Sequence, residues 1–173
     1  MGKLKFLFLT IVALCALSCA KSEPPVALVE YAQACDAANN DKRIAVQGFL
    51  NAVGTTPCLK FMKIGKNGAS TRECGFKLLD KVNITGNEII VYVTEGKERS
   101  QVETPDAGLD NVKPTSTFAR ENLKLRLDDG TEVAPQESVA TPVRVTGEIS
   151  LTDKSDGTGG KNCSLHASKV EKR

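Results

Sequence analysis

Cysteine is the residue type with the most chemistry to offer in this sequence of 173 residues, which contains six cysteines and a single histidine. Four of the cysteines lie beyond the first twenty residues: Cys35, Cys58, Cys74 and Cys163. The C-x-x-C spacing that is typical of zinc sites is absent, so we expect no bound metal. Because residues 1–18 have the pattern of an export signal, these four thiols instead predict two disulfides.

A predicted hairpin indicates which of these thiols pair. Residues 59–64 and 74–79 have the apolar content of strands, and they flank residues 65–68 (Gly-Lys-Asn-Gly), a turn sequence with an Asn-Gly signal. The midpoint between Cys58 and Cys74 falls inside this turn. The two thiols should therefore lie opposite each other across the hairpin, at a separation that a disulfide can bridge.

By elimination, Cys35 pairs with Cys163, and this bond would join the start of the domain to its end. In the chain-entropy picture a loop of that length stabilises the fold by about 4–5 kcal/mol, and the hairpin loop by about 3 kcal/mol. Free reactive thiols are the alternative, and no C-x-x-C motif supports them.

His166 is the only candidate for a general base. Catalysis would need a nucleophile and an acid beside it, and Ser164 and Ser168 are neighbours only along the chain. Residues 157–161 (Gly-Thr-Gly-Gly-Lys) lack the spacing of a phosphate loop. We therefore expect no catalytic residue and no cofactor, with His166 at a surface position of a strand.

Residues 1–18 have the pattern of a secretory signal peptide. Lys3 and Lys5 precede an apolar run, Phe6 to Leu17, that is too short to span a bilayer as a helix. Removal of this segment leaves 155 residues with 21 basic and 21 acidic side chains. A balanced charge makes nucleic acid an unexpected partner, because nucleic-acid-binding domains are usually clearly basic.

The end of that segment, Ala16-Leu17-Ser18-Cys19, resembles the lipobox of bacterial lipoproteins. The resemblance implies lipidation of Cys19, a tether over residues 19–25, a domain over residues 26–173, and a location in the cell envelope on the periplasmic or surface side of a membrane. The leucine stands two positions before Cys19, where the family prefers three. Ala16-x-Ser18 would also suit ordinary signal cleavage, which would leave Cys19 unmodified.

Periodicity indicates the elements that position these residues. Leu28, Tyr31, Ala32 and Cys35 fall on one face of a helix, which predicts an N-terminal helix that ends near Ala38. The period then changes to two, and strands are expected over residues 43–50, 89–93, 123–127, 143–151 and 163–170, in addition to the hairpin. Residues 94–121 lack periodicity and are predicted to be an insertion loop.

Glycines inside two of the strands, Gly48 and Gly147, predict bulges or bends of the kind that close a sheet. At this point the chain resembles OB-fold proteins, most of all the exported OB-fold lipoproteins of bacteria. The residues that carry the likeness are 43–50, 76–80, 142–149 and 165–171, as the first, second, fourth and fifth strands. The resemblance implies a mainly β fold, a small five- to six-stranded OB-like barrel with one N-terminal helix. An immunoglobulin-like sandwich is the alternative.

Ligands of OB folds lie across the second and third strands. The candidate binding face is Lys60, Lys63, Arg72, Lys77 and Tyr92. One interpretation is a basic groove with aromatic platforms for single-stranded nucleic acid or an anionic polymer. The other, which the balanced charge favours, is a solvated hairpin.

Two functional hypotheses follow. The first is a non-enzymatic, lipid-anchored module that binds an envelope protein or polymer. The second is a nucleic-acid binder that uses the same strand face. A hydrolase that uses His166 comes third.

Overall fold

The computed structural model describes residues 25–51, 55–62, 70–82, 88–96, 99–103, 115–119, 123–133, 141–157 and 159–173. Only the backbone is described for 55–57, 59–62, 70–71 and 115–119. The predicted signal segment, Cys19 and the turn at residues 65–68 lie outside these ranges.

The described chain is mainly β, as the sequence predicted. Its elements are β1 (Leu28–Val29), η1 (Tyr31–Gln33), η2 (Ala37–Asn39), β2 (Arg43–Asn51), β3 (Thr55–Met62), β4 (Ser70–Leu79), β5 (Ile89–Thr94), β6 (Val102–Glu103), β7 (Thr115–Ala119), β8 (Lys124–Arg126), β9 (Glu132–Val133), β10 (Pro142–Asp153) and β11 (Lys161–Lys172). The predicted strand regions all contain strands.

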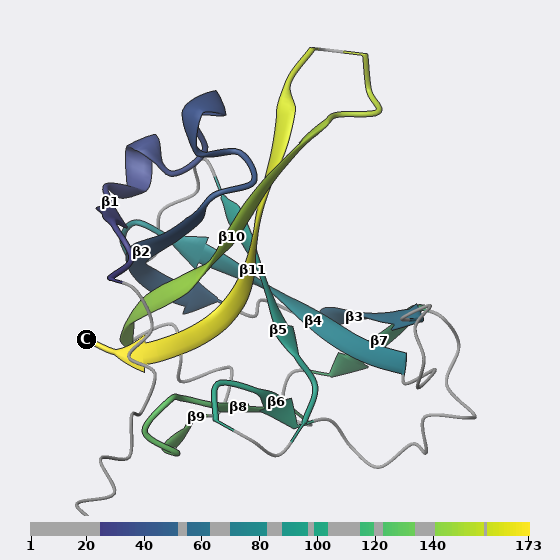
Figure 1. Cartoon of the computed structure of the whole chain (residues 1–173). Helices are drawn as coiled ribbons and strands as arrows, with labels where there is room; N and C mark the ends of the chain where they lie inside the picture. Colours follow the sequence, from purple (N-terminus) through teal and green to yellow (C-terminus); the bar gives the residue numbers. More distant parts are fainter. Residues whose placement is uncertain are drawn as a thin grey trace, which may run out of the picture.

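Eight strands form one sheet in the order β1-β2-β10-β11-β5-β4-β3-β7, with a further pairing between β2 and β4. That pairing makes a closed circuit of five strands, β2, β10, β11, β5 and β4 (Figure 1). All contacts in the circuit are antiparallel except that between β5 and β11, which is parallel. The sheet has more strands than the five to six expected, because short segments such as β1 and β7 extend it beyond the circuit.

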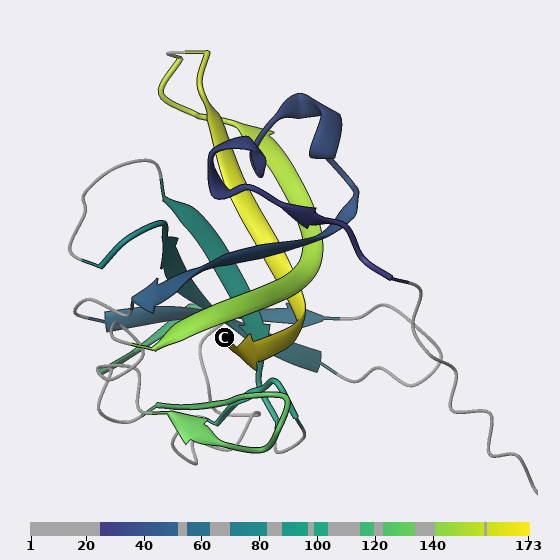
Figure 2. The same ribbon diagram turned by 90° about the vertical axis from the view of Figure 1, so that its left-hand side faces the viewer.

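The apolar core lies on the inner side of this circuit. In β5 the side chains alternate strictly, so that Ile89, Val91 and Val93 are buried and the residues between them are partly exposed. A second sheet, in the order β6-β8-β9, adds Val102 and Leu125 to the same core cluster. Figures 1 and 2 both place this small sheet at the opposite end of the molecule from the tip of the β10–β11 hairpin.

The predicted N-terminal helix is wrong. Residues 25–40 form β1 and two short 3-10 turns, and Leu28 is 51% exposed where the helical pattern required a buried position. The backbone bonds to the sheet, since the Ala45 amide donates to the Ala27 carbonyl oxygen at 2.9 Å. A helix of this length is marginal by itself, so strand pairing and the disulfide of Cys35 decide the conformation.

The segment predicted as an insertion loop contains regular structure. β6 pairs with β8, and β7 pairs with β3 along Thr55–Leu59. The prediction was wrong here because both strands are short and polar, so they carry little periodic signal. Their pairing depends on partners that are distant in the sequence.

Both predicted disulfides are present. Cys58 and Cys74 are direct partners in the β3–β4 register, with Cα atoms 4.0 Å apart, and both are fully buried. Cys35 bonds to Cys163 across 128 positions of sequence, with a Cα separation of 5.8 Å. The second bond holds the N-terminal turns against β11.

The glycines inside the strands mark the places where the circuit bends. A Cβ on Gly48 would lie 2.5 Å from the Leu79 carbonyl oxygen, at the point where β2 passes from β10 to β4. A Cβ on Gly147 would overlap the His166 carbonyl group, beside a register shift in the β10–β11 pair. The prediction of a bulge at Gly147 is confirmed.

Candidate functional site

An aromatic pair lies on the outer face of the strand circuit. Tyr92 and His166 are register partners in the parallel β5–β11 pair, so their side chains leave the same face. Their rings stack with centroids 5.2 Å apart and planes inclined by 24°. Tyr92 points outward because its neighbours in β5 point into the core.

Glu73 completes this group of three. Nδ1 of His166 donates to Oε2 of Glu73 at 3.2 Å. A carboxylate oxygen accepts hydrogen bonds, so Nδ1 is the donor in this contact and Nε2 is left to a further hydrogen-bonding partner. The side chains are 42% and 20% exposed for His166 and Glu73, and this leaves the ring open to a ligand.

Gly75 decides how Tyr92 lies on the sheet. Gly75 is the β4 partner of Tyr92, and a Cβ placed on it would lie 3.3 Å from Cε1 of the tyrosine ring. The missing side chain lets the ring rest beside the β4 backbone. Residues 75, 92 and 166 therefore form one row across three strands.

The same row continues onto β10 and β2. Glu148 is the register partner of both His166 and Arg43, so all three side chains share the outer face. Arg43 also donates to Oγ of Ser168 at 3.3 Å. On β4, Lys77 forms an ion pair with Glu88 at 2.7 Å. These two cations, Arg43 and Lys77, thus each have an oxygen atom beside them.

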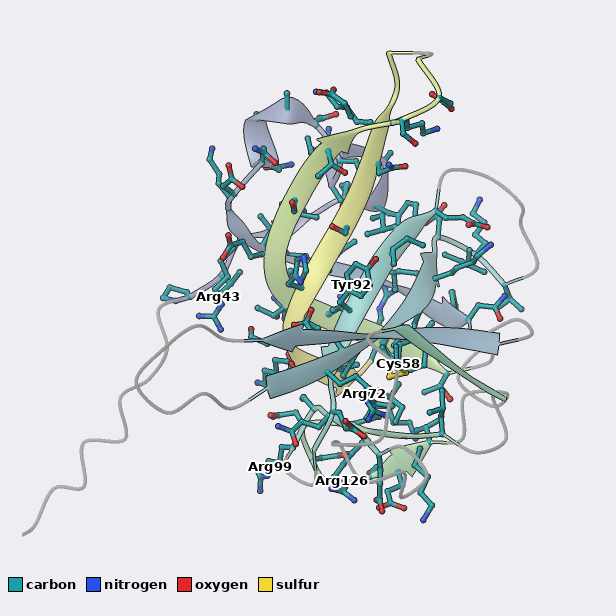
Figure 3. The ribbon with its side chains drawn as sticks, turned by 90° about the vertical axis from the view of Figure 1, so that its right-hand side faces the viewer. Arg43, Cys58, Arg72, Tyr92, Arg99 and Arg126 are labelled. Carbon is teal, nitrogen blue, oxygen red and sulfur yellow. A yellow bond between two sulfur atoms is a disulfide. The ribbon has the colours of Figure 1, made fainter. Side chains whose placement is uncertain are left out.

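The structure divides the five residues of the predicted binding face. Tyr92 and Lys77 lie on the outer face, whereas Arg72 is 1% exposed and its Nε lies 3.3 Å from Oε2 of Glu95. Figure 3 shows Arg72 directed from β4 toward the small sheet, away from Tyr92. Lys60 pairs with Arg72 through the backbone, but its side chain, like all of Lys63, lies outside the described residues.

Arg72 points inward because of register. It shares a side of β4 with the buried residues Cys74 and Phe76, two and four positions away.

Sequence reasoning missed Glu73 entirely and treated His166 as an isolated surface residue. The signal available was the alternation within 72–76, which places Glu73 and Gly75 on the face opposite Cys74.

The hydroxyl groups closest in sequence to His166 are used elsewhere. Ser164 donates to the Ser150 carbonyl oxygen at 3.3 Å, and Ser168 donates to the Thr146 carbonyl oxygen at 3.2 Å. Within the described ranges no group of three or more histidine, cysteine or acidic side chains is arranged to hold a metal ion. The contacts that the described side chains of this face make are stacking, hydrogen bonds and ion pairs.

A pocket of about 220 Å³ lies beside β1, and its lining includes Leu28, Glu30, Tyr31 and Asp80. The Tyr31 hydroxyl donates to the Leu78 carbonyl oxygen at 2.7 Å. Burial raises the pKa of Tyr31 to about 12. No histidine or cysteine lines this pocket.

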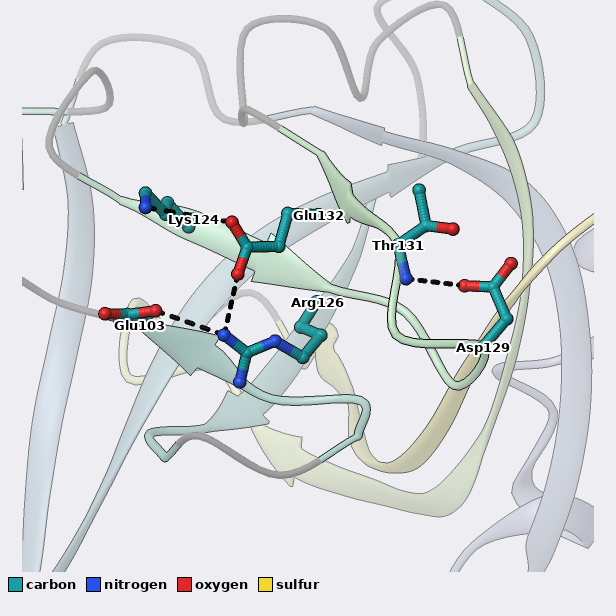
Figure 4. Close-up of polar contacts among 6 residues, drawn as sticks. All are labelled: Glu103, Lys124, Arg126, Asp129, Thr131 and Glu132. Atoms are coloured by element: carbon teal, nitrogen blue, oxygen red, sulfur yellow. Dashed lines mark hydrogen bonds and ion pairs between the residues drawn. The ribbon is translucent and has the colours of Figure 1, made fainter.

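The small sheet carries a separate cluster of charges (Figure 4). Nη2 of Arg126 lies 3.2 Å from Oε2 of Glu103 and 2.7 Å from Oε1 of Glu132. The hydrogen bond from Arg126 lowers the pKa of Glu132, and the backbone amide of Thr131 lowers the pKa of Asp129. These contacts join β6, β8 and β9 to one another, so we assign them a structural role.

No protein-family profile matches the sequence, and no curated protein matches it. Among solved structures, the chain is similar to the N-terminal domain of an archaeal MCM, with 11% sequence identity and a TM-score of 0.41. The matched region covers 84% of this chain and 61% of that one.

In the described part of the chain, no helix has the length and apolar character needed to cross a membrane.

Proposed function

We propose that this protein is a non-enzymatic binding module of the bacterial cell envelope, attached to a membrane through a lipid on Cys19. The observation that carries the proposal is the pair of disulfides, Cys35–Cys163 and Cys58–Cys74. Structural disulfides form and persist in oxidising compartments, which fits export under the signal-like segment 1–18. The lipobox-like residues that end this segment supply the attachment point.

The finer fold assignment is an OB-like barrel. Its support is the closed circuit β2-β10-β11-β5-β4 together with the parallel contact between β5 and β11. Bends at Gly48 and Gly147 are the devices by which a sheet turns into a barrel. The small sheet, through Val102, Leu125 and Val133, would then close one end.

A binding role is favoured by the outer face of this barrel. Tyr92 and His166 expose a stacked aromatic surface there, and Glu73 orients the imidazole. A stacked, partly exposed pair on rigid strands is held in one geometry before any ligand arrives. Such a preorganised surface lowers the entropy cost of binding.

Metabolic labelling with an alkyne analogue of palmitate tests the attachment. The full-length chain should incorporate label in a bacterial host, and Cys19→Ala should lose it. Cys15→Ala, within the same apolar segment, is the matched control and should label like the wild type. Equal labelling of Cys19→Ala and the wild type would refute the lipid anchor.

A second candidate is single-stranded nucleic acid, which the Tyr92–His166 stack favours because bases stack on exposed aromatic rings. Binding should then weaken steeply with salt, and Lys60→Ala with Lys63→Ala should make the salt dependence shallower. Lys124→Ala, which removes an exposed lysine of the small sheet, is the control and should leave the salt dependence unchanged. The absence of salt-dependent retention of a single-stranded oligonucleotide would exclude this candidate.

A further inference from the structure

We propose that Tyr92, His166 and Glu73 form a subsite for a neutral pyranose ring of an envelope glycan. This inference rests on the proposed function, because it names the ligand class of the same module. The site spans β4, β5 and β11, and therefore includes a strand outside the predicted binding face.

The first argument is the shape of the surface. The two rings are stacked with centroids 5.2 Å apart and planes inclined by 24°, so each covers part of one face of the other. A sugar would pack on an outer face of the pair, where the His166 side chain is 42% exposed. The flat side of a pyranose presents weakly positive C–H groups, and the faces of aromatic rings are electron-rich. Gly75 places no side chain against the ring of Tyr92, and the side chain of Glu73, also on β4, contacts His166 next to it.

The second argument is the set of polar atoms at the edge of this surface. The contact between Nδ1 of His166 and Oε2 of Glu73 leaves Oε1 of Glu73 as a further acceptor and Nε2 of His166 as a further hydrogen-bonding atom. The Tyr92 hydroxyl can both donate and accept. Sugar hydroxyl groups donate and accept in the same way, so these atoms can fix the orientation of a ring that stacks on the pair.

The third argument is charge. Among the described residues, three carboxylates and two cations lie near the pair or form an ion pair with a group that does: Glu73, Glu88, Glu148, Lys77 and Arg43. Lys77 is held by Glu88 at 2.7 Å, and Arg43 is the register partner of Glu148. Among these described side chains the cations are matched by carboxylates, so they offer no excess of positive charge to a polyanion and suit an uncharged ligand.

The test is calorimetric titration of the oxidised, full-length protein, in detergent, with neutral oligosaccharides of glucose, galactose and N-acetylglucosamine. At least one series should bind. Tyr92→Ala and His166→Ala should each weaken binding about tenfold, which corresponds to about 1.4 kcal/mol. Tyr92→Phe keeps the ring and should stay within about threefold of the wild type, and Tyr31→Phe, away from the face, should bind unchanged. Intact mass and circular dichroism of each variant establish that it is folded and oxidised.

Three results would overturn the subsite. They are no binding to any of the three series, equal binding by Tyr92→Ala and the wild type, and binding of a single-stranded oligonucleotide in place of the neutral sugars. The lipid anchor is judged separately by the labelling of Cys19→Ala. Sugar binding without labelling would remove the anchor alone, and labelling without sugar binding would remove the subsite alone.

Discussion

Glu73 and His166 are 93 residues apart in the sequence, and Oε2 of one lies 3.2 Å from Nδ1 of the other. They come from β4 and β11, which pair with opposite edges of β5. The two side chains therefore meet above β5, next to Tyr92. This contact turns a lone histidine into part of an oriented group.

The Glu73–His166 contact should contribute little to stability, since both side chains reach solvent. A double-mutant cycle of Glu73→Gln and His166→Asn, followed by urea unfolding at neutral pH, should give a coupling free energy of at most about 1 kcal/mol. A coupling above about 2 kcal/mol would contradict the exposed placement. With the small coupling that we expect, the main effect of the contact is to orient the imidazole.

The two disulfides should differ in what they contribute. Cys35→Ser with Cys163→Ser opens a loop that spans 128 positions, and it should lower the free energy of unfolding by about 4–5 kcal/mol. Cys58→Ser with Cys74→Ser opens a span of 16 positions and should cost about 3 kcal/mol. Guanidinium unfolding without reductant measures both. A larger loss for the hairpin pair would contradict the loop-length account.

Replacement of Gly147 should be far more harmful than replacement of Gly75. The added methyl group of Gly147→Ala overlaps the backbone of β11 and should cost about 3 kcal/mol or more, because a backbone cannot move aside as a side chain can. In Gly75→Ala the methyl group meets the Tyr92 ring at 3.3 Å, and a small tilt of the ring should keep the loss below about 1 kcal/mol. Urea midpoints of the two variants provide the comparison, and equal losses would argue against it.

The pKa of Tyr31, raised by burial from 10.0 to about 12, predicts a loss of stability in alkali. Between these values the unfolded chain releases the phenol proton while the folded chain retains it. The free energy of unfolding should therefore fall as pH rises from about 10 to 12, by up to about 2 kcal/mol.

Tyr31→Phe should remove this alkaline loss, although it also removes the hydrogen bond to Leu78 and should cost about 1 kcal/mol at neutral pH. The sequence contains two tyrosines, so ultraviolet titration of Tyr92→Phe reports Tyr31 alone. Titration of that single tyrosine at its ordinary pKa would refute the prediction.

The stability that the charged cluster of the small sheet contributes to the fold should fall in acid. The pKa values of Glu132 and Asp129 are lowered from 4.5 and 3.8, by the hydrogen bond from Arg126 and by the amide of Thr131. Groups with lowered pKa stabilise the fold above their ordinary pKa, and this contribution disappears as pH falls through the folded value. Urea midpoints should drop below pH 4.5, and less steeply in Glu132→Gln than in the control Glu148→Gln. Identical acid profiles would mean that the cluster does not support the sheet.

The sequence by itself determined the disulfide pairing and most strand regions, though not β1, β6, β7 or β9. Alternation of buried and exposed side chains is a local property, and the sequence shows it in residues 89–93 and 143–151. The Cys58–Cys74 bond followed from the hairpin, because strands joined by a short connection face each other symmetrically about it. Cys35–Cys163 followed by elimination.

The N-terminal segment shows where local pattern fails. Leu28, Tyr31, Ala32 and Cys35 have helical spacing, yet β1 pairs with β2 and the turns follow the disulfide. A short helix has too little intrinsic stability to compete with a sheet edge and a covalent bond. Both of these partners lie far along the chain, beyond the reach of a periodicity argument.

Only the tertiary structure decided what the outer face contains. Arg72 looks like a surface cation in the sequence, but it lies on the core side of β4, while its neighbour Glu73 lies on the outer side. The row Gly75, Tyr92, His166 joins three strands whose order and register are set by long-range pairing. Residue types and their alternation can be recognised in short stretches of the sequence. The site, in contrast, depends on which strands become neighbours, and the burial of a shared core decides that.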